Sequence, residues 1–465
     1  MQQPKIVARK KPVIEVNGLQ FKDLNGNGKL DKYEDWRLSP EERAEDLIHQ
    51  MMVDEKLGLF VICDKQMGKN VQDKSQTSHD GILSEVEKMR DSGPFKGTME
   101  YGTTKMIKDM HIRHIILREK YQPSDLAKWV NALNEVAEET RLGIPVIVAS
   151  NSRNENDRVT FDDEDRTTSF TAWPGTLGIA ATQDLNVVKE FAETGRKEWN
   201  ATNIRKGYMY MADTTTNPCW YRITETFGED SEFIGKLIET IIETYQGEEL
   251  AEDRIALTIK HFPGGGAREN GYDPHYEEGK YNVYPTPGSL EKYHLPPFIA
   301  AVKKQPSSIM PYYAIPSNDK SASPQLPFVG PFEEVGFAYN KGFIDGLLRE
   351  KLGFNGYVNS DTGILTKMAW GVEELTEAER VAKAFQSGTD LISGHNEIKP
   401  FKDAYEQGLL SEELIDQATK RSLKELFALG LFENPYRDPE VADQIVNTDE
   451  SRASPVKPMK NPLSF

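Results

Sequence analysis

Eight short runs of apolar and β-branched residues recur along the chain, and longer segments with a different pattern separate them. The runs cover residues 57–63, 112–117, 144–150, 203–213, 256–263, 307–313, 356–362 and 389–394. Each run is apolar almost throughout and does not alternate with polar positions, which is typical of strands that are buried on both faces. The pattern therefore predicts eight strands of a parallel sheet.

The segments between the runs show the apolar spacing of three and four residues that indicates an amphipathic helix. In residues 123–141, for example, Ser124 is placed to cap such a helix. The same spacing recurs in residues 184–200, 230–248, 290–304, 340–352, 374–386 and 411–429. Alternating strands and helices predict an α/β fold: a closed (β/α)8 barrel of the TIM type with enlarged βα loops. A doubly wound open sheet is the alternative.

This pattern divides the chain of 465 residues into three parts. We expect an N-terminal extension over residues 1–38, a (β/α)8 barrel over residues 39–435 and a polar C-terminal tail over residues 436–465. The extension contains a loop with the pattern of a calcium-binding EF-hand.

Composition narrows the class of partner. Hydrophobic residues make up 38% of the chain and charged residues 28%, which is the balance of a globular protein. The formal net charge of -18 disfavours nucleic acids and anionic membranes, so we expect a neutral or cationic ligand. No apolar run reaches the ~20 residues that span a bilayer, and no hydrophobic signal segment follows the basic residues near the N-terminus. We therefore expect a cytoplasmic protein or one from which a leader has been removed. Cys63 and Cys219 are far apart, which favours two ordinary thiols.

Polar residues stand where the predicted strands end. The set comprises Asn151, Asp213, Lys260, His261, Tyr312, Tyr313 and Asp361. In a (β/α)8 barrel the active site is built at this end of the strands, from the strand ends and the βα loops. One such residue can simply cap a strand or fill a barrel layer, but seven of them together indicate a site.

Three motifs in this part of the chain resemble glycoside hydrolase family 3. KHFPGGG (260–266) resembles the family's KHFPGHG, NPCWYRITETFGED (217–230) resembles DPRWGRVEETFGED, and GFNGYVNSDTG (353–363) resembles GFDGLVVSDW. The segment ERAEDLIHQMMVDEKLGLF (42–60) also looks like the family's opening helix. The similarity runs from about residue 43 to about residue 435, with every motif in family order.

The resemblance implies a retaining β-glycosidase that removes a terminal sugar from the non-reducing end. A β-glucosidase is the first choice because it is the commonest activity of the family, and a β-xylosidase or β-N-acetylglucosaminidase is the alternative. Asp361 stands at the position of the nucleophile, which forms a covalent glycosyl-enzyme that water then hydrolyses. By the family's pattern Lys260, His261 and Arg222 bind the sugar, and Tyr313 hydrogen-bonds near the nucleophile. No metal or cofactor is expected in catalysis.

The glycines that follow His261 have a physical reason in this scheme. They allow the backbone to pass close to a ligand or to turn sharply, which a Cβ atom would obstruct. For Lys260, a salt bridge to a barrel carboxylate is an alternative that is compatible with sugar binding.

Two positions depart from the family pattern. Asn151 stands where the family usually has an aspartate that grips the outer hydroxyls of the sugar. An amide donates and accepts hydrogen bonds, but it lacks the charge-assisted strength of a carboxylate. Thr362 stands where a tryptophan commonly follows the nucleophile, which removes a stacking surface. The identity of the sugar and of the leaving group is therefore left open.

The general acid is the largest gap in the scheme. Many family members draw it from a second α/β domain, and the predicted tail is too short and too polar to supply one. Either that domain is missing from this chain or the acid lies in the barrel. Single-domain N-acetylglucosaminidases of the family use an Asp-His pair on the loop after KHFPGHG. Asp273 and His275 keep that order here, which makes His275 the candidate proton donor. Glu269 and Glu277 on the same loop are alternatives, as is a simple surface turn at 273–276.

Residues 23–34, DLNGNGKLDKYE, match the twelve-residue EF-hand loop. The predicted ligands are Asp23, Asn25 and Asn27, the carbonyl of Lys29, and Glu34, with Gly28 at the bend. A single structural Ca²⁺ would pin the N-terminal segment, and a metal-free Asn-Gly turn is the alternative.

Two other classes of protein stay open at this point. One is a non-catalytic carbohydrate-binding barrel, which Asn151 and the missing domain would suit. The other is a metal-dependent hydrolase with His261 and Asp361 as ligands, which is disfavoured because the first strand ends in Cys63 and Asp64 without paired histidines. A homo-oligomer, in which a partner subunit covers the barrel mouth, is also left open.

Overall fold

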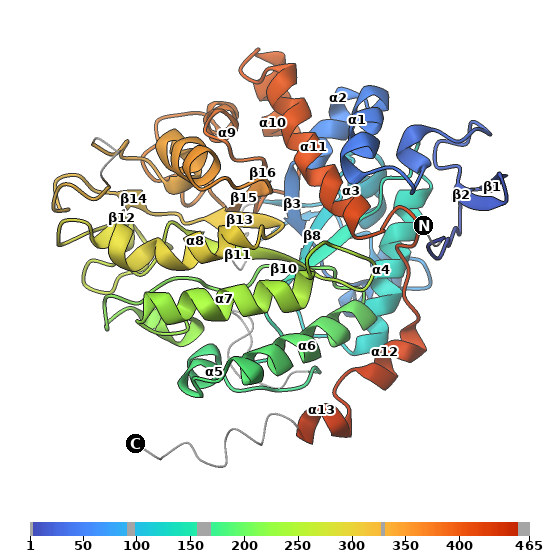
Figure 1. The fold of residues 1–465 in the computed structure, drawn as a ribbon. Coiled ribbons are helices and arrows are strands. Elements are labelled where there is room, and N and C mark those ends of the chain that lie inside the picture. Colours follow the sequence, from blue (N-terminus) through green and yellow to red (C-terminus); the bar gives the residue numbers. More distant parts are fainter. Residues whose placement is uncertain (1–2, 91–97, 156–168, 327–330, 454–465) are drawn as a thin grey trace.

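The computed structural model describes residues 3–90, 98–155, 169–326 and 331–453, and at its centre is a closed barrel of parallel strands (Figure 1). The barrel strands are β3 (Val61–Asp64), β8 (His114–Leu117), β9 (Ile147–Ser150), β10 (Lys206–Gly207), β11 (Ala256–Phe262), β13 (Ser308–Pro311), β15 (Tyr357–Thr362) and β16 (Leu391–Ser393). They follow one another around the barrel in chain order, with β16 pairing back to β3. This confirms the predicted closed barrel over the doubly wound sheet.

Each predicted run overlaps one of these strands, and two runs differ from their strands the most. Residues 57–59 of the first run belong to helix α2 (Val53–Leu59), so the strand prediction is wrong there. The run 203–213 keeps only the two residues of β10 as a strand, followed by a single bridge between Met211 and Lys260. An apolar run marks a buried segment, and it does not distinguish a buried helix end from a buried strand.

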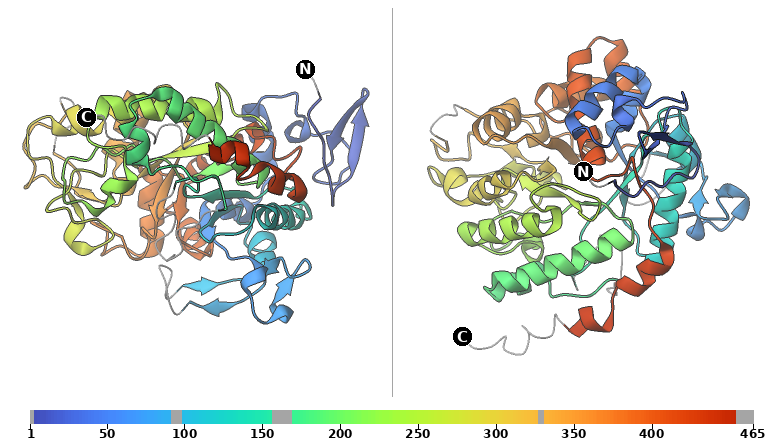
Figure 2. Two further views of the ribbon diagram at one scale, coloured as in Figure 1. Left: turned by 90° about the horizontal axis from the view of Figure 1, so that it is seen from below. Right: turned by 45° about the vertical axis from the view of Figure 1, so that its right-hand side comes forward.

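Helices cover the outside of the barrel (Figures 1 and 2). They are α1 (Pro40–Gln50), α2, α3 (Thr103–Lys108), α4 (Pro123–Glu138), α5 (Thr176–Ala181), α6 (Leu185–Ala201), α7 (Ser231–Gln246), α8 (Pro296–Lys303), the π-helix η8 (Gly342–Lys351), α9 (Glu377–Gln386), α10 (Lys399–Glu406) and α11 (Glu412–Ala428). Local sequence sets several of their starts. Asp230, for instance, accepts hydrogen bonds from the Glu232 and Phe233 amides at the start of α7. The predicted helix 290–304 begins with a π-helical turn, Leu290–His294, before α8.

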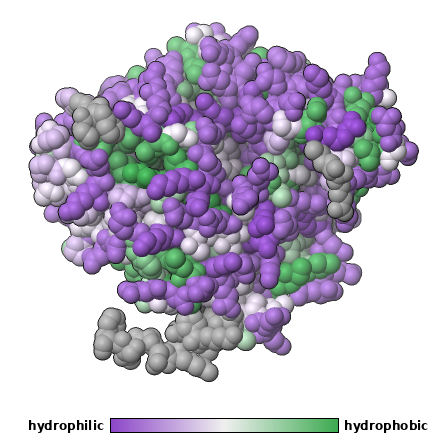
Figure 3. Space-filling view, viewed as in Figure 1, coloured by the Kyte–Doolittle hydropathy of each residue, from purple (hydrophilic) through white to green (hydrophobic). Residues whose placement is uncertain are grey.

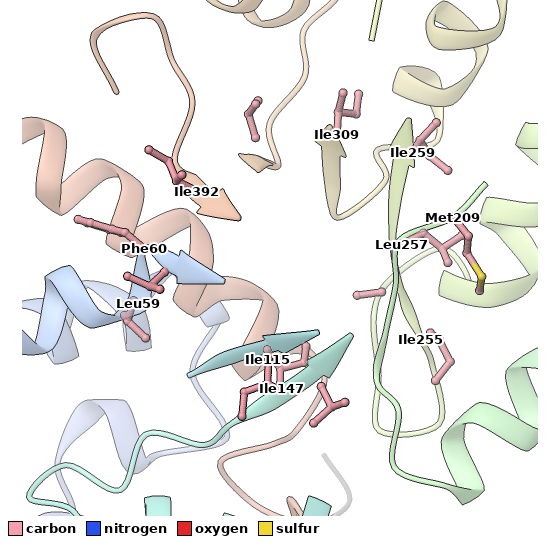
Figure 4. Close-up of a cluster of buried hydrophobic side chains, with 14 of the residues drawn as sticks. Leu59, Phe60, Ile115, Ile147, Met209, Ile255, Leu257, Ile259, Ile309 and Ile392 are labelled. Carbon is pink, nitrogen blue, oxygen red and sulfur yellow. The ribbon is translucent and has the colours of Figure 1, made fainter. Parts of the chain in front are cut away.

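Apolar residues form one layer inside the barrel and another between the strands and helices. Ile62, Ile116, Ala149, Tyr208, Met310, Tyr357 and Leu391 make up a separate inner cluster. Their neighbours Ile115, Ile309 and Ile392 belong to the larger cluster that the helices cover (Figure 4). Side chains alternate between the two sides along each strand, so both layers need apolar residues. This explains why the runs are apolar throughout.

A buried polar network closes the end of the barrel where the strands begin. Lys206 of β10 forms an ion pair with Glu425 of α11, and both side chains are 2% exposed or less. Glu425 also accepts hydrogen bonds from the hydroxyls of Ser307 and Tyr357. The ammonium of Lys206 lies 4.5 Å from the centroid of the Tyr357 ring. This end of the barrel, where the strands begin, is the barrel floor. Helix α11 is held to it by an ion pair whose two charges neutralise each other.

The segments at either end of the chain pack against the barrel. A hairpin of β1 (Val13–Val16) and β2 (Leu19–Lys22) precedes the short 3-10 helix η1 (Lys32–Glu34). Helix α12 (Pro439–Ile445) contacts α4 and α6, and α13 (Asp449–Ala453) follows it. The part of the predicted tail that the structure describes thus includes two helices, and residues 454–465 lie outside the described residues.

Several loops after the strands are large. The loop after β3 carries four short strands, which project from the barrel as the light-blue segment in Figure 2: β4 (Thr77–Ser78), β5 (Leu83–Ser84), β6 (Lys88–Met89) and β7 (Met99–Glu100). The loops after β11 and β13 pair through β12 (Tyr281–Asn282) and β14 (Ile315–Pro316). Polar side chains cover most of the face in Figure 3, and apolar ones form separate patches. Within the described ranges, no helix combines the length and apolarity needed to cross a bilayer.

Candidate active site

A histidine lies between two carboxylates at the mouth of the barrel. The Nδ1 atom of His261 is 2.9 Å from Asp213 Oδ2, and its Nε2 atom is 3.7 Å from Asp361 Oδ2. Asp213 is fully buried, whereas the side chain of Asp361 is 14% exposed. Burial lowers the pKa of His261 in spite of the nearby carboxylates. In its neutral form the ring can donate from Nδ1 to Asp213, which leaves Nε2 as an acceptor.

Asp213, which follows β10 in the chain, orients His261. Burial alone would raise the pKa of Asp213, but His261 and the backbone N–H of Gly265 hold it below its usual range. Asp213 also accepts a hydrogen bond of 3.1 Å from the His261 amide. It is a fixed anion whose hydrogen bonds set the ring orientation of His261.

The glycine run is explained by contacts with the protein. A Cβ atom on Gly265 would lie 2.8 Å from both Asp213 Oδ1 and the Tyr312 ring. A Cβ atom on Gly266 would lie 1.9 Å from the carbonyl oxygen of Thr214. The backbone after His261 therefore passes close to the end of the neighbouring barrel segment, as a glycine permits.

Among the residues that the structure describes, no carboxylate is in direct contact with Lys260. Its Nζ atom donates to Asn151 Oδ1 over 3.3 Å. Burial and the neighbouring Arg222 lower the pKa of Lys260 to about 8, although Asp361 acts in the opposite direction. The ammonium group thus has hydrogen-bonding capacity left at the barrel mouth.

Arg222 is 3% exposed and lies in the short 3-10 helix η4 (Tyr221–Glu225). It binds Glu225 through Nε and Nη2 at 3.1 and 2.8 Å. Its Nη1 atom approaches the hydroxyl of Tyr312 at 3.4 Å. Glu225 and Tyr312 therefore fix the plane of the guanidinium group.

Asp361 lies near the end of β15, where its Oδ1 atom accepts a 2.7 Å hydrogen bond from the Thr362 amide. The hydroxyl of Tyr313 donates to the Thr362 carbonyl over 2.8 Å. Burial raises the pKa of Tyr313, and the charge of Asp361 raises it further. Arg118, which follows β8, donates to Thr362 Oγ1 over 3.2 Å.

Asp273 and His275 lie at the same mouth, on the long loop after β11. Asp273 Oδ1 contacts His275 Nδ1 directly, and Asp273 is 2% exposed. The His275 side chain is 24% exposed, and its ring meets the edge of the Tyr313 ring at 4.9 Å between centroids. The structure therefore brings the Asp-x-His pair next to the tyrosine that borders Asp361.

The two glutamates of this loop lie in exposed ion pairs. Glu269 pairs with Lys320 at 2.6 Å. Glu277, whose side chain is 77% exposed, pairs with Lys280 at 3.5 Å. Neither pair involves a residue of the cluster around Asp361.

Sequence reasoning did not assign a role to three of the residues around this site. Arg118 is the first residue after a barrel strand, so the strand-end rule could have found it. In the sequence Tyr312 stands out only as a strand end, and Trp220 only as part of a motif. The contacts that Trp220 and Tyr312 make with Asp273 join segments far apart in the chain, and no local pattern predicts such contacts.

The EF-hand-like loop uses its side-chain oxygens on its own backbone. Asp23 accepts hydrogen bonds from the amides of Asn27 and Gly28, at 3.0 and 2.9 Å. Glu34 accepts one of 2.7 Å from Leu24 and one of 3.0 Å from Asp31. Elsewhere the Asn25 and Asn27 side-chain amides both contact Asp31, and the Lys29 amide donates to Asn27. Across the described residues, no group of three or more histidines, cysteines, aspartates or glutamates is arranged to hold a metal ion.

Comparison with known proteins gives a consistent match over most of the chain. The model of the glycosyl hydrolase family 3 N-terminal domain matches residues 65–424. The probable beta-glucosidase C of Aspergillus flavus is 34% identical over 431 residues, which cover 90% of this chain and 62% of that protein. The periplasmic beta-glucosidase/beta-xylosidase of Dickeya chrysanthemi is 33% identical over 476 residues, covering 96% of this chain and 67% of that protein.

A solved β-glucosidase of Erythrobacter marinus has the same fold, with a TM-score of 0.72 at 23% identity over 92% of this chain and 50% of that one. The chain thus spans between half and two thirds of the length of these proteins.

Proposed function

The chain belongs to glycosyl hydrolase family 3, and on that premise we propose that it is a retaining, exo-acting β-glycosidase, with β-glucosides as the preferred substrates. The observation that carries the proposal is the position of Asp361. Its carboxylate lies 3.7 Å from His261 Nε2, and it acts electrostatically on Lys260 and Tyr313. A carboxylate at a barrel strand end, surrounded by directed donors, suits attack on a neutral sugar.

The reaction has two steps. In the first, an oxygen of Asp361 bonds to the anomeric carbon while the bond from that carbon to the leaving-group oxygen breaks, and His275 gives its proton to that oxygen. In the second, His275 takes a proton from water, the water oxygen bonds to the anomeric carbon, and the Asp361 carboxylate leaves. Two displacements retain the β configuration.

His275 is the proposed acid and base, with Asp273 as its partner. Because Nδ1 faces the Asp273 carboxylate, we assign the transfer of the proton to Nε2. The exposed ion pairs of Glu269 and Glu277 support this choice over the two glutamates.

Lys260, His261 and Arg222 are the proposed sugar-binding residues. Lys260 and Arg222 donate to sugar hydroxyls, and His261 Nε2 accepts from one, so a neutral sugar is oriented through three fixed groups. Asn151, which accepts from Lys260, contacts the outer hydroxyls in place of a carboxylate. A β-xylosidase or a β-N-acetylglucosaminidase is the alternative within the same scheme. The proposed catalytic unit is residues 39–435, between the N-terminal extension and the C-terminal segment.

Covalent labelling tests the proposal. The protein is incubated with 2,4-dinitrophenyl 2-deoxy-2-fluoro-β-glucoside, and intact mass and peptide mapping locate the label. We expect one sugar per chain on Asp361, because the fluorine slows the second step more than the activated first step. Asp361→Asn should take no label, whereas the matched control Asp253→Asn, an exposed carboxylate on the surface, should be labelled like the parent.

Absence of label from glucoside, xyloside and N-acetylglucosaminide reagents alike would favour a non-catalytic carbohydrate-binding barrel. A panel of nitrophenyl glycosides ranks the three sugars by kcat/KM. His275→Ala should slow hydrolysis of alkyl glycosides far more than hydrolysis of dinitrophenyl glycosides, because only the former need a proton on the leaving oxygen.

For the EF-hand-like loop we propose a structural Ca²⁺ held by Asp23, Asn25, Asn27, the Lys29 carbonyl and Glu34. The support is the complete ligand spacing of the EF-hand loop in residues 23–34. Chelation should lower the melting temperature by several degrees and added Ca²⁺ should restore it, since a ligand that binds only the folded state stabilises it. An unchanged melting temperature would favour a metal-free turn.

A further inference from the structure

Asp273 is a buried carboxylate with more hydrogen-bond donors than the Asp-His pair requires. Its Oδ1 atom contacts His275 Nδ1 and accepts from the His275 amide over 3.2 Å. Its Oδ2 atom accepts from Trp220 Nε1 over 2.8 Å and from the Tyr312 hydroxyl over 2.5 Å. One oxygen therefore faces the histidine, and the other is held by two side chains from different barrel loops.

Both of these donors are fixed by their surroundings. Trp220 is 1% exposed and Tyr312 is fully buried. The Tyr312 ring lies 4.6 Å from the His261 ring and 5.4 Å from the guanidinium carbon of Arg268. Neither side chain can turn away from Asp273 without moving the core of the site.

Burial would raise the pKa of Asp273, yet its contacts with His275, with Tyr312 and with the charge of Arg222 hold that pKa well below its usual range. The Tyr312 hydroxyl also receives the contact of 3.4 Å from Arg222 Nη1. Tyr312 thus stands between the proposed sugar-binding arginine and the proposed acid.

We propose that Trp220 and Tyr312 are positioning residues for proton transfer: they hold Asp273 as an oriented anion, and through it the ring of His275. A carboxylate with one oxygen occupied by two donors cannot rotate, so its other oxygen presents a fixed acceptor to Nδ1. His275 then keeps Nε2 directed at the leaving group. The inference rests on the proposed function, because it concerns the acid of that reaction.

The test uses Tyr312→Phe and Trp220→Phe, each of which removes one donor and keeps an aromatic ring. Rates are measured with an alkyl β-glycoside, which needs a proton on its leaving oxygen, and with a dinitrophenyl β-glycoside, which does not. We expect Tyr312→Phe to lower kcat for the alkyl substrate by roughly 10- to 100-fold, and kcat for the dinitrophenyl substrate by less than about threefold. Trp220→Phe should show the same selectivity, without the change in KM that loss of the Arg222 contact gives to Tyr312→Phe.

Tyr339→Phe is the matched control. The Tyr339 hydroxyl is buried and donates to the Ile364 carbonyl over 2.8 Å, so its removal costs a similar hydrogen bond away from Asp273. Any loss in this variant should be equal for the two substrates.

A double-mutant cycle separates a positioning role from a structural one. In a His275→Ala background, Tyr312→Phe should have no further effect on kcat for the alkyl substrate, because residues that act through one group are not additive. Equal losses on both substrates, or full additivity with His275→Ala, would overturn the inference while the labelled Asp361 still stood. A parent protein that takes no label would instead overturn the proposed function, and the positioning role with it.

Discussion

The two ends of the barrel each hold a lysine in the interior, and the two lysines have different surroundings. Lys206, where the strands begin, is paired with Glu425 and lies over the Tyr357 ring. Lys260, where the strands end, has an amide oxygen as its hydrogen-bond partner in the described structure. Burial lowers the pKa of both lysines, to about 8 for Lys260.

The contrast separates polar residues that hold the fold from polar residues that meet a ligand. At the floor the charge of Lys206 is neutralised by Glu425, which also satisfies two hydroxyls. At the mouth Lys260 donates one hydrogen bond, to Asn151, among the described residues, and removing an ammonium group from water costs free energy unless its remaining N–H groups find acceptors. Among the described residues Lys260 has no carboxylate in direct contact, and this supports the proposal that substrate binds at the mouth.

The largest expected effect comes from removing the carboxylate at the mouth. Asp361→Asn should lower kcat by on the order of 10⁴-fold or more, because an amide is a far weaker nucleophile than the carboxylate that is proposed to form the covalent intermediate. The free energy of unfolding should change by less than about 1 kcal/mol, since the side chain is partly exposed. Steady-state rates on an activated glycoside and urea unfolding measure the two quantities. A variant that lost stability in proportion to its activity would place Asp361 with the structural residues.

The opposite result is expected at the floor. Glu425→Gln should lower the free energy of unfolding by roughly 3–5 kcal/mol, because it leaves the Lys206 charge buried without its partner. The folded variant should keep kcat within about twofold, as the site lies at the other end of the strands. Urea unfolding measures the loss.

Helix α1 supplies a matched control for this prediction, through its ion pair with α11. Glu41 pairs with Lys424 at 2.7 Å, and its side chain is 50% exposed. Glu41→Gln should cost less than about 1 kcal/mol, as surface ion pairs usually do. Equal losses of unfolding free energy in the two variants would mean that the buried pair of Lys206 and Glu425 contributes no more to stability than a surface ion pair.

The fold was predictable because the barrel buries each strand on both faces. Residues such as Ile115 and Ile116 point to opposite sides, yet both pack in apolar clusters, so the runs stand out in the sequence. The ends of the elements were less predictable. Leu57 and Leu59 are as apolar as the strand that follows them, and only the completed packing shows that they belong to a helix.

The site was predictable only in part. Lys260, His261 and Asp361 each stand at a strand end, where the barrel architecture directs attention. The hydrogen bonds from Trp220 and Tyr312 to Asp273 were not predictable, because the two donors are 53 and 39 residues away from Asp273 in the chain. Such contacts depend on how the loops fold over the mouth of the barrel. The spacing of residues in the sequence does not predict how these loops fold.

The pH dependence of sugar binding should distinguish the two lysines. The pKa of Lys260 is about 8, so its charge-assisted donors are lost as the pH rises through that value, and affinity for the free sugar should fall about fivefold. Binding should take up a proton near pH 8, because the sugar favours the charged form. Calorimetry in buffers of different ionisation enthalpy measures both effects.

The contribution of Lys260 to the free energy of unfolding changes with pH in the opposite direction to the sugar affinity. The folded pKa of Lys260 lies below the unfolded value of about 10.4, so between about pH 8 and pH 10 the folded state binds fewer protons than the unfolded chain. Its contribution to stability therefore rises with pH in that window. Lys260→Met should remove the alkaline loss of sugar affinity, whereas Lys206→Met should leave it unchanged. An alkaline loss that survives Lys260→Met would assign it to another group.

The smallest expected effect comes from making the mouth lysine resemble the floor lysine. Asn151→Asp would place a carboxylate oxygen where the amide oxygen now lies, 3.3 Å from Lys260 Nζ. A negative charge at that distance favours the ammonium form, so the alkaline loss of affinity should move up by about one pH unit or more. Affinity for a sugar with free outer hydroxyls should improve by at most about fivefold, because a carboxylate accepts more strongly than an amide but is now shared with the lysine. An unmoved pH profile would show that Asn151 does not contact Lys260 in solution, and the contrast between the two ends of the barrel would lose its basis at the mouth.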